Sequence, residues 1–258
     1  MRYSLTLQAQ PSPIDRRFRD ARRVQDLTTL PTTCTLADWL GIVRDQNVPG
    51  YGECSGESGA GAMDWLCRRY RQEVFTGSSL GLYQVERALV GEEAQDAGAR
   101  LRQTQIAMQT VGVWSDRLDP DTREDFVVRI TPEMLADAAR HRIREGLWCP
   151  SLEEILSAMA DPDEPVVVQA GIVVYPGFEA PETLRTGAIP MPRPEEQPLG
   201  GHAILLYGYS IPDQVVFFRN SWGTGFGQGG NGTLPFAYFR SPMTFLSARA
   251  YYLAPQEA

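Results

Sequence analysis

The clearest pattern of apolar positions lies in the last third of the chain. Two apolar runs, residues 203–209 and 215–218, are separated by a turn that contains Pro212 and Asp213. Apolar runs on either side of such a turn are typical of an antiparallel β-hairpin. Upstream, residues 166–175 form a continuous apolar run rich in β-branched side chains, which predicts a buried strand. Two further strands are expected at residues 234–239 and 248–253.

Helix-type patterns dominate the first two thirds of the chain. Helices are predicted over residues 54–70, 79–89, 94–111, 132–143 and 151–160. The first of them has small residues through its first half, so neighbouring elements can approach it closely, as expected of a central helix. His141 lies between Arg140 and Arg142, and these charged neighbours predict a solvated helix position. Residues 177–199 are rich in proline and predict a long surface loop.

Composition narrows the class of protein. The chain has 258 residues, which suits one large domain or two closely packed lobes. Its net charge of -8 argues against a general nucleic-acid binder. No apolar run approaches the roughly 20 residues that cross a bilayer, and the N-terminus shows no secretory signal. We therefore expect a soluble, cytoplasmic protein.

The four cysteines, Cys34, Cys54, Cys67 and Cys149, do not follow a metal-type spacing. Without a secretory signal they are expected to be reduced thiols.

Two polar residues bracket the predicted hairpin. His202 stands at the start of its first strand and Asn220 follows its second strand. Antiparallel pairing therefore brings them close together. An imidazole held by a neighbouring amide can serve as a general base for a nucleophile, so the pattern predicts that a nucleophile lies nearby.

The residues around this pair resemble a known family. Residues 201–203 and 220–224 are similar to the His and Asn boxes of papain-like, C1-type cysteine peptidases, in the same order and at a similar separation. The resemblance implies a Gln and then a Cys at a helix start upstream, and Gln46 and Cys54 match these positions. It points to a bacterial or phage-type member without a long prosegment.

Family resemblance also implies a role for each site residue. The implied residues are Cys54 as nucleophile, His202 as base, Asn220 as the group that orients it, Gln46 at the oxyanion, and Gly98, Ala99 and Trp222 at the substrate groove. A thiol at a helix N-terminus beside an imidazole is expected to have its pKa lowered by one to several units from about 8.5. The resemblance implies a peptide or protein substrate and no metal or organic cofactor.

The implied fold class is α+β, with a papain-like division into two lobes. We expect an N-terminal arm over residues 1–30, a mainly helical lobe over about residues 31–150, and a mainly antiparallel β lobe over residues 151–258. The helical lobe would be built on the cysteine-bearing helix, and the cleft would lie between the lobes.

Departures from the family pattern leave alternatives open. Ser55 and Glu57 stand where the family has different residues, and Glu53 precedes the cysteine. Carboxylates near a thiolate oppose its ionisation. One alternative is therefore a weakly active or inactive papain-fold component of a larger assembly such as a virion, with the N-terminal arm as a contact to an assembly partner. Another is a cell-wall peptide hydrolase.

Overall fold

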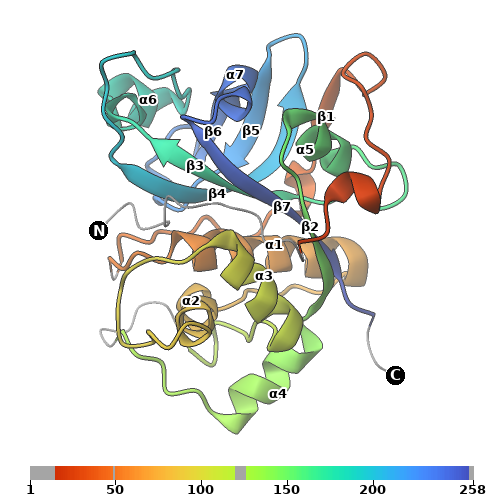
Figure 1. Cartoon of the computed structure of the whole chain (residues 1–258). Coiled ribbons are helices and arrows are strands. Elements are labelled where there is room, and N and C mark those ends of the chain that lie inside the picture. Colours follow the sequence, from red (N-terminus) through yellow and green to blue (C-terminus); the bar gives the residue numbers. More distant parts are fainter. Residues whose placement is uncertain (1–14, 49, 120–125, 256–258) are drawn as a thin grey trace.

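The computed structural model describes residues 15–48, 50–119 and 126–255 (Figure 1). The helices among them are α1 Cys54–Arg71, α2 Ser79–Ala88, α3 Leu101–Thr110, α4 Pro132–Arg140, α5 Leu152–Met159, α6 Pro181–Thr186 and α7 Phe236–Arg240, with short 3₁₀ turns η1 Phe18–Asp20, η2 Ala37–Trp39 and η3 Pro176–Glu179. The strands are β1 Thr33–Thr35, β2 Ile143–Trp148, β3 Val168–Val174, β4 Gly200–Ser210, β5 Val215–Arg219, β6 Asn231–Pro235 and β7 Phe245–Leu253. The predicted mixture of helices with an antiparallel sheet is confirmed.

One antiparallel sheet forms the upper half of the molecule in Figure 1, in the order β2-β7-β3-β4-β5-β6, with β1 added to β4. Every residue of β3 is buried, which confirms the predicted internal strand. The predicted hairpin is β4 and β5, and its pairing sets Leu205 opposite Arg219. Since Asn220 directly follows Arg219, the hairpin returns the chain toward His202 on β4.

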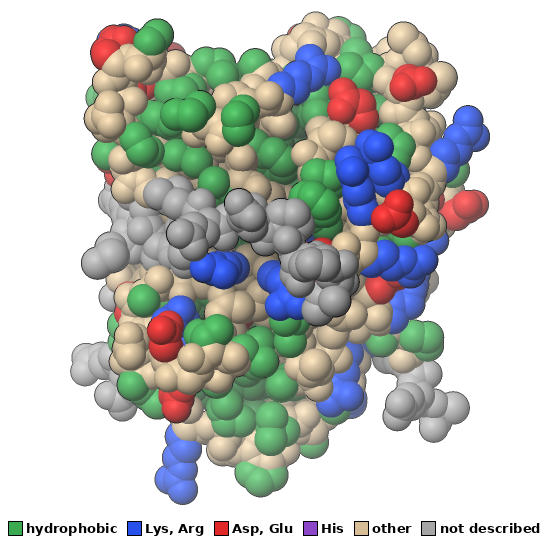
Figure 2. All heavy atoms as spheres, in the orientation of Figure 1, with side chains coloured by type: hydrophobic (Ala, Val, Ile, Leu, Met, Phe, Trp, Pro, Cys, Tyr) green, Lys and Arg blue, Asp and Glu red, His purple; other side chains and the backbone are tan. Residues whose placement is uncertain are grey.

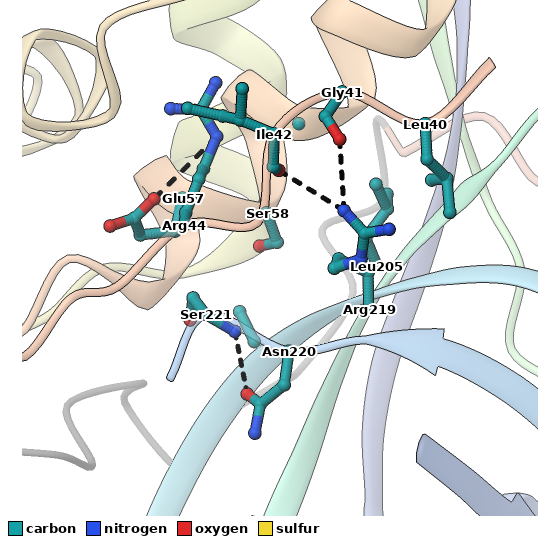
Figure 3. A pocket seen from close by; sticks show the side chains of 12 residues that line it. Leu40, Gly41, Ile42, Arg44, Glu57, Ser58, Leu205, Arg219, Asn220 and Ser221 are labelled. Carbon is teal, nitrogen blue, oxygen red and sulfur yellow. Dashed lines mark hydrogen bonds and ion pairs between the residues drawn. The ribbon is translucent and has the colours of Figure 1, made fainter. Parts of the chain in front are cut away.

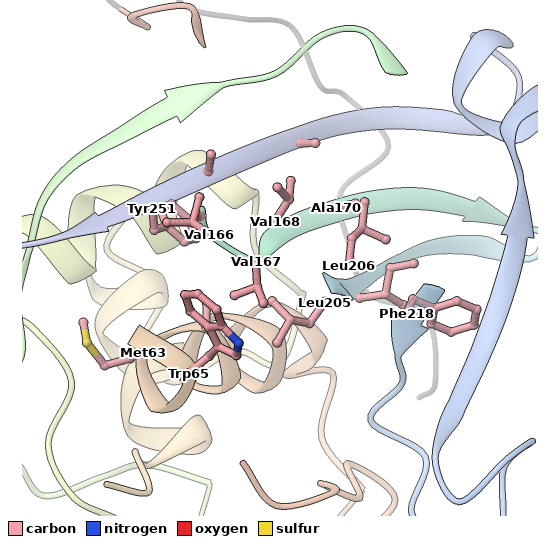
Figure 4. Packing of buried hydrophobic residues seen from close by; sticks show 14 of the residues in the cluster. Met63, Trp65, Val166, Val167, Val168, Ala170, Leu205, Leu206, Phe218 and Tyr251 are labelled. Atoms are coloured by element: carbon pink, nitrogen blue, oxygen red, sulfur yellow. The ribbon is translucent and has the colours of Figure 1, made fainter. Parts of the chain in front are cut away.

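Helix α1 lies between the sheet and the other helices of the lower half (Figure 1). It packs on α2 and α3 and also on β4 and β7, so most of its residues are buried. Such a helix has no wide polar face. Met63 and Trp65 of α1 belong to the same core as Val167 and Leu205 (Figure 4). The predicted central helix is therefore confirmed, and it packs directly against the sheet.

Three predicted boundaries are wrong. The helix expected from residue 94 begins at Leu101, because the αL conformation of Gly98, with φ of 73°, interrupts the preceding segment. The stretch 234–239 is a strand only to Pro235, which has no backbone N–H to continue the ladder and is the N-terminal cap of α7. The loop expected at residues 177–199 contains η3 and α6, each with a proline in its first turn.

His141 also differs from its prediction. Helix α4 ends at Arg140, and His141 is its C-terminal cap. The side chain turns inward and is 2% exposed, while Arg140 remains exposed. The chain then enters β2, an edge strand whose charged residues and bulge between Ile143 and Glu145 hide its alternation from a sequence pattern.

The segment from residue 15 to residue 30 is tied to the sheet side of the molecule. Arg17 and Arg19 both bond to the buried Glu154 of α5, at 2.9 and 2.6 Å, and the Phe18 side chain is fully buried. Figure 2 shows arginine and acidic side chains interspersed on the right of the molecule, where this segment lies in Figure 1. The first 14 residues of the predicted arm lie outside the described residues, and the division at residues 30 and 150 stays a prediction.

Among the described residues, none of the helices combines the length and apolar character required to span a bilayer.

Candidate active site

Cys54 is the first residue of α1 and is 1% exposed. Its position at the helix N-terminus exposes the thiol to the positive end of the helix dipole, which favours the thiolate. Cys54 belongs to a small buried cluster with Leu101 of α3 and Ala203 of β4. Ala203 is the neighbour of His202, so α1 and the histidine strand meet at this cysteine.

His202 and Asn220 form the predicted pair. Their Nε2 and Oδ1 atoms lie 2.8 Å apart, and both side chains are buried. The same Oδ1 accepts the Ser221 backbone N–H at 2.9 Å, which identifies it as the carbonyl oxygen of the amide. His202 must therefore donate from Nε2, and the lone pair of the neutral ring is on Nδ1.

The protonation of His202 is controlled mainly by burial. Loss of hydration lowers the pKa of His202 to about 4, and the hydrogen bond to Asn220 opposes this effect. The imidazole is thus neutral near neutral pH and can accept a proton at Nδ1. A thiolate beside the ring would favour the imidazolium again.

Aromatic rings surround the imidazole. The Trp222 ring centroid is 5.3 Å from that of His202, and Phe178 packs edge-on to both rings at 5.1 Å from Trp222 and 6.2 Å from His202. These rings exclude water from the side of the site where His202 and Asn220 pair. Trp222 thus covers the imidazole, and its expected contact with substrate stays a prediction. Phe178 was missed because it lies in the proline-rich segment that resembled a surface loop.

Gln46 is held beside the same residues by a short antiparallel contact. Its backbone N–H donates to the Ser221 carbonyl at 2.9 Å, and the Ser221 hydroxyl donates to its Oε1 at 2.6 Å. The Gly223 N–H donates to the Arg44 carbonyl at 2.9 Å. These bonds orient the Gln46 carboxamide and direct its Nε2 donor to the side away from Ser221. Sequence reasoning did not identify Ser221 as the residue that positions Gln46.

Hydrogen bonds hold the segment around Gly98 close to the N-terminus of α1. The Gly98 N–H donates to the Tyr83 hydroxyl at 2.8 Å, and that hydroxyl donates to Asp96 at 2.9 Å. Asp96 also accepts the Gly52 N–H at 2.9 Å, two residues before Cys54. Gly98 and Ala99 are both buried. Their segment therefore lies near the start of α1, and its pairing with a substrate stays a prediction.

The polar departures from the family pattern have partners of their own. Glu57 accepts the Ser79 hydroxyl at 2.8 Å and lies 3.9 Å from Arg44 Nε, so a cation offsets its charge. Ser55 donates to Glu86 at 2.5 Å, and burial raises the pKa of Glu86 to about 7. Both side chains are thereby used in packing α1 against α2 and the Arg44 segment.

Figure 3 shows the space behind these residues. Arg44, Glu57, Asn220 and Ser221 are among the residues that line a cavity of about 20 Å³, enough for one water molecule. Its lining comes from residues 40–44, from α1, from β4 and from residues 219–221, so the cavity lies where these four segments meet.

Gln169 is a further residue that the sequence analysis missed. It lies in the buried strand β3 and donates from Nε2 to the Ser55 carbonyl and the Ser58 hydroxyl, both at 2.8 Å. The Tyr251 hydroxyl donates to its Oε1 at 2.5 Å. A single amide in an otherwise apolar run was the available signal. These bonds hold the first turn of α1 against β3 and β7.

Side chains that could bind a metal ion cluster away from Cys54 and His202. Among the described residues, one group of His, Cys and acidic side chains is close enough to share an ion, and it consists of Cys67, Glu73 and His141. Cys67 lies about 20 Å along α1 from Cys54 at 1.5 Å per residue.

Comparisons with known proteins agree with this architecture. No protein-family model matches the chain. An uncharacterized peptidase C1-like protein of Acanthamoeba polyphaga mimivirus is 26% identical over 251 residues, covering 92% of this chain and 74% of that protein.

Two solved structures extend the comparison. The crystal structure of xylellain, a cysteine protease from Xylella fastidiosa, superposes with a TM-score of 0.85 at 22% identity and covers 98% of this chain and 97% of that one. Digestive procathepsin L 3 from the larval midgut of Tenebrio molitor gives a TM-score of 0.70 at 16% identity, covering 96% and 77%. These likenesses identify the fold.

Proposed function

We propose that this chain, which has a papain-like fold and is similar to a peptidase C1-like protein, is a C1-type cysteine peptidase that hydrolyses peptide bonds through Cys54, His202 and Asn220. The observation that carries the proposal is the 2.8 Å contact between His202 Nε2 and Asn220 Oδ1. It leaves Nδ1 as the proton acceptor of a histidine whose neighbour, Ala203, packs with Cys54. Such an arrangement suits a thiol nucleophile with an oriented base.

In the first half of the reaction, the Cys54 thiol transfers its proton to His202 Nδ1. The sulfur then bonds to the carbonyl carbon of the substrate, and the electron pair of the C=O bond moves to oxygen. The Gln46 Nε2 group and the Cys54 backbone N–H would donate to this oxyanion. As it collapses, the C–N bond breaks, the amine takes the proton from His202, and a thioester remains on Cys54.

Hydrolysis of the thioester completes the cycle. His202 Nδ1 takes a proton from water as its oxygen bonds to the acyl carbon. The C–S bond breaks, the acid leaves, and the proton returns to sulfur. Asn220 keeps Nε2 protonated throughout, so that Nδ1 is the nitrogen that exchanges protons. The ion pairing of Glu57 with Arg44 supports activity because it reduces the repulsion that this carboxylate would exert on a thiolate.

Alkylation of the four thiols tests whether Cys54 is activated. Cys34 is the most exposed cysteine, and burial raises its pKa to about 11. If exposure decided the rate, a limiting dose of iodoacetamide at pH 6 would label Cys34 first. We expect Cys54 to be labelled first, as read by peptide mass spectrometry, and we expect His202→Ala to slow that labelling. Labelling of Cys34 ahead of Cys54 would contradict the proposal.

Cleavage of a mixed peptide library tests the reaction itself. We expect the wild-type chain and a Cys34→Ala control to cut peptides, and Cys54→Ala to cut none. The products should be peptides with new carboxyl and amino termini, and no acyl group should be transferred to other amines. Cleavage that persists in Cys54→Ala would remove this residue from the mechanism.

A further inference from the structure

Three metal-type donor atoms meet at the far end of α1. The Cys67 sulfur, a Glu73 carboxylate oxygen and a ring nitrogen of His141 all lie within 4.8 Å of one another. They come from the last turns of α1, the residue after its cap, and the end of α4. Thiolate, carboxylate and imidazole are the three side-chain types that bind zinc.

The backbone conformation at the ends of α1 and α4 brings these three side chains together. Gln72 caps α1 in a left-handed conformation, with φ of 55°, and the Glu73 N–H then turns back to the Cys67 carbonyl at 3.2 Å. A non-glycine residue in this conformation is uncommon. His141 caps α4 in turn, and its carbonyl accepts the Val113 N–H at 3.1 Å. Two helix ends therefore fix the three side chains relative to one another.

The orientation of His141 is the strongest evidence for a bound cation. Its Nδ1 lies 3.0 Å from the Asp137 carbonyl oxygen, which can only accept, so Nδ1 carries a proton. The ring stacks on Phe75 with centroids 3.9 Å apart. Its Nε2 is then directed at a Glu73 carboxylate oxygen at 3.1 Å. Two acceptors facing each other need a proton or a cation between them.

This arrangement matches the surroundings of a metal-binding histidine. Such histidines commonly donate their second N–H to a backbone carbonyl, which fixes the tautomer. A simple ion pair between His141 and Glu73 would satisfy these two residues alone. It would leave the buried sulfur of Cys67 beside them as a packing group of the core only, whereas a zinc ion would bond to all three.

An ion could reach the group from solvent. The Glu73 side chain is 37% exposed, and Glu73 and His141 line an open cavity of about 620 Å³. The neighbouring Asp137 is engaged, since it accepts the Ser115 N–H at 2.7 Å and pairs with Arg140. Water from the cavity could therefore take the fourth position of a tetrahedral ion.

We propose that Cys67, Glu73 and His141 form a zinc site that fastens the end of α1 to the end of α4. The ligands of a tetrahedral zinc ion are about 3.3–3.8 Å apart, so the group would contract by up to about 1 Å on binding. Burial raises the pKa of the Cys67 thiol far above its usual range, and binding would release its proton. This inference does not depend on the proposed peptidase activity.

Zinc titration of the full chain tests the site. A Cys54→Ala background removes the other thiol that lies beside a histidine, and a phosphine reductant keeps the remaining thiols free. With zinc chloride in a calorimeter we expect one ion per chain. At zinc 100-fold above the Kd, we expect the melting temperature to rise by about 5–10 °C. Cobalt(II) should give a sulfur-to-metal charge-transfer band.

Variants separate this site from adventitious binding. Cys67→Ala, His141→Gln and Glu73→Gln should each weaken zinc binding by at least about 10-fold, and Cys67→Ala should remove the cobalt band. Glu73 is partly exposed, so Glu73→Gln should fold. Cys149→Ala is the matched control, because Cys149 is also fully buried but lies outside the group. Unchanged zinc affinity in Glu73→Gln or Cys67→Ala, or the absence of stoichiometric binding, would overturn the proposal.

Discussion

At the scale of single residues, the orientation of His202 depends on one amide oxygen. Asn220 Oδ1 accepts from both His202 Nε2 and the Ser221 N–H. Asn220→Asp would keep both hydrogen bonds but place a negative charge beside the ring. We expect the pKa of His202 to rise from about 4 by about 1–3 units.

Nuclear magnetic resonance titration of the ring signals measures this shift. The chain has two histidines, so the ring signals of His141, which lies outside the site, serve as the internal reference. Asn220→Ala should lack the rise, because it supplies no charge. An unchanged His202 pKa in Asn220→Asp would show that the two side chains are not paired in solution.

At the scale of elements, the small residues of α1 set its distance from α2. A methyl group at Gly56 would press on the Ser79 carbonyl oxygen, which is backbone, and meet Tyr83 Cβ at 3.0 Å. One at Gly61 would meet Leu205 Cδ2 at an ordinary 3.4 Å. We expect Gly56→Ala to lower the free energy of unfolding by about 2 kcal/mol or more, and Gly61→Ala to raise it by about 0.5–1 kcal/mol.

Urea unfolding of both variants gives the comparison, because they make the same substitution in the same helix. Equal effects would mean that helix propensity, and not the approach of α2, decides the stability of this region.

The same helix shows how far the sequence could predict the fold. The buried strand β3 and the β4–β5 hairpin follow from local patterns, because their strands are apolar runs. The start of α1 followed from the family resemblance, which places a cysteine at a helix start, and its central position followed from the small residues of its first half. Strand β2 was missed because it lies at the edge of the sheet and carries a bulge between Ile143 and Glu145. The inward turn of His141 depends on tertiary contacts with Phe75 and Glu73. No local pattern encodes such contacts.

The candidate active site could likewise be predicted only where local patterns bring its residues together. His202 and Asn220 flank a hairpin, so their pairing could be predicted from chain order. Ser221 and Gln169 act on residues that are 175 and 114 positions away in the chain. Their roles could not be predicted, because a local sequence pattern does not specify which distant segments of the chain come into contact.

At the scale of the whole molecule, two buried groups give the stability opposite dependences on pH. Burial lowers the pKa of His202 from 6.5 to about 4. The unfolded chain therefore binds a proton that the folded chain rejects, and stability is lost as the pH falls from about 6.5 to 4. Burial raises the pKa of Glu86 from 4.5 to about 7. The folded chain then keeps a proton that the unfolded chain releases, and stability is lost as the pH rises through that range.

Each of these effects amounts to about 3 kcal/mol, so in the wild type they largely cancel between about pH 4.5 and 6.5. Glu86→Gln should expose the His202 effect, because the amide still accepts from Ser55 but cannot titrate. We expect its free energy of unfolding, measured in urea across this range, to fall on acidification relative to the wild type. His202→Gln should show the reverse slope, and the double variant should remove both contributions. A Glu86→Gln chain with the pH dependence of the wild type would mean that Glu86 is not protonated in the folded protein. The short bond from Ser55 would then have to be made to a carboxylate.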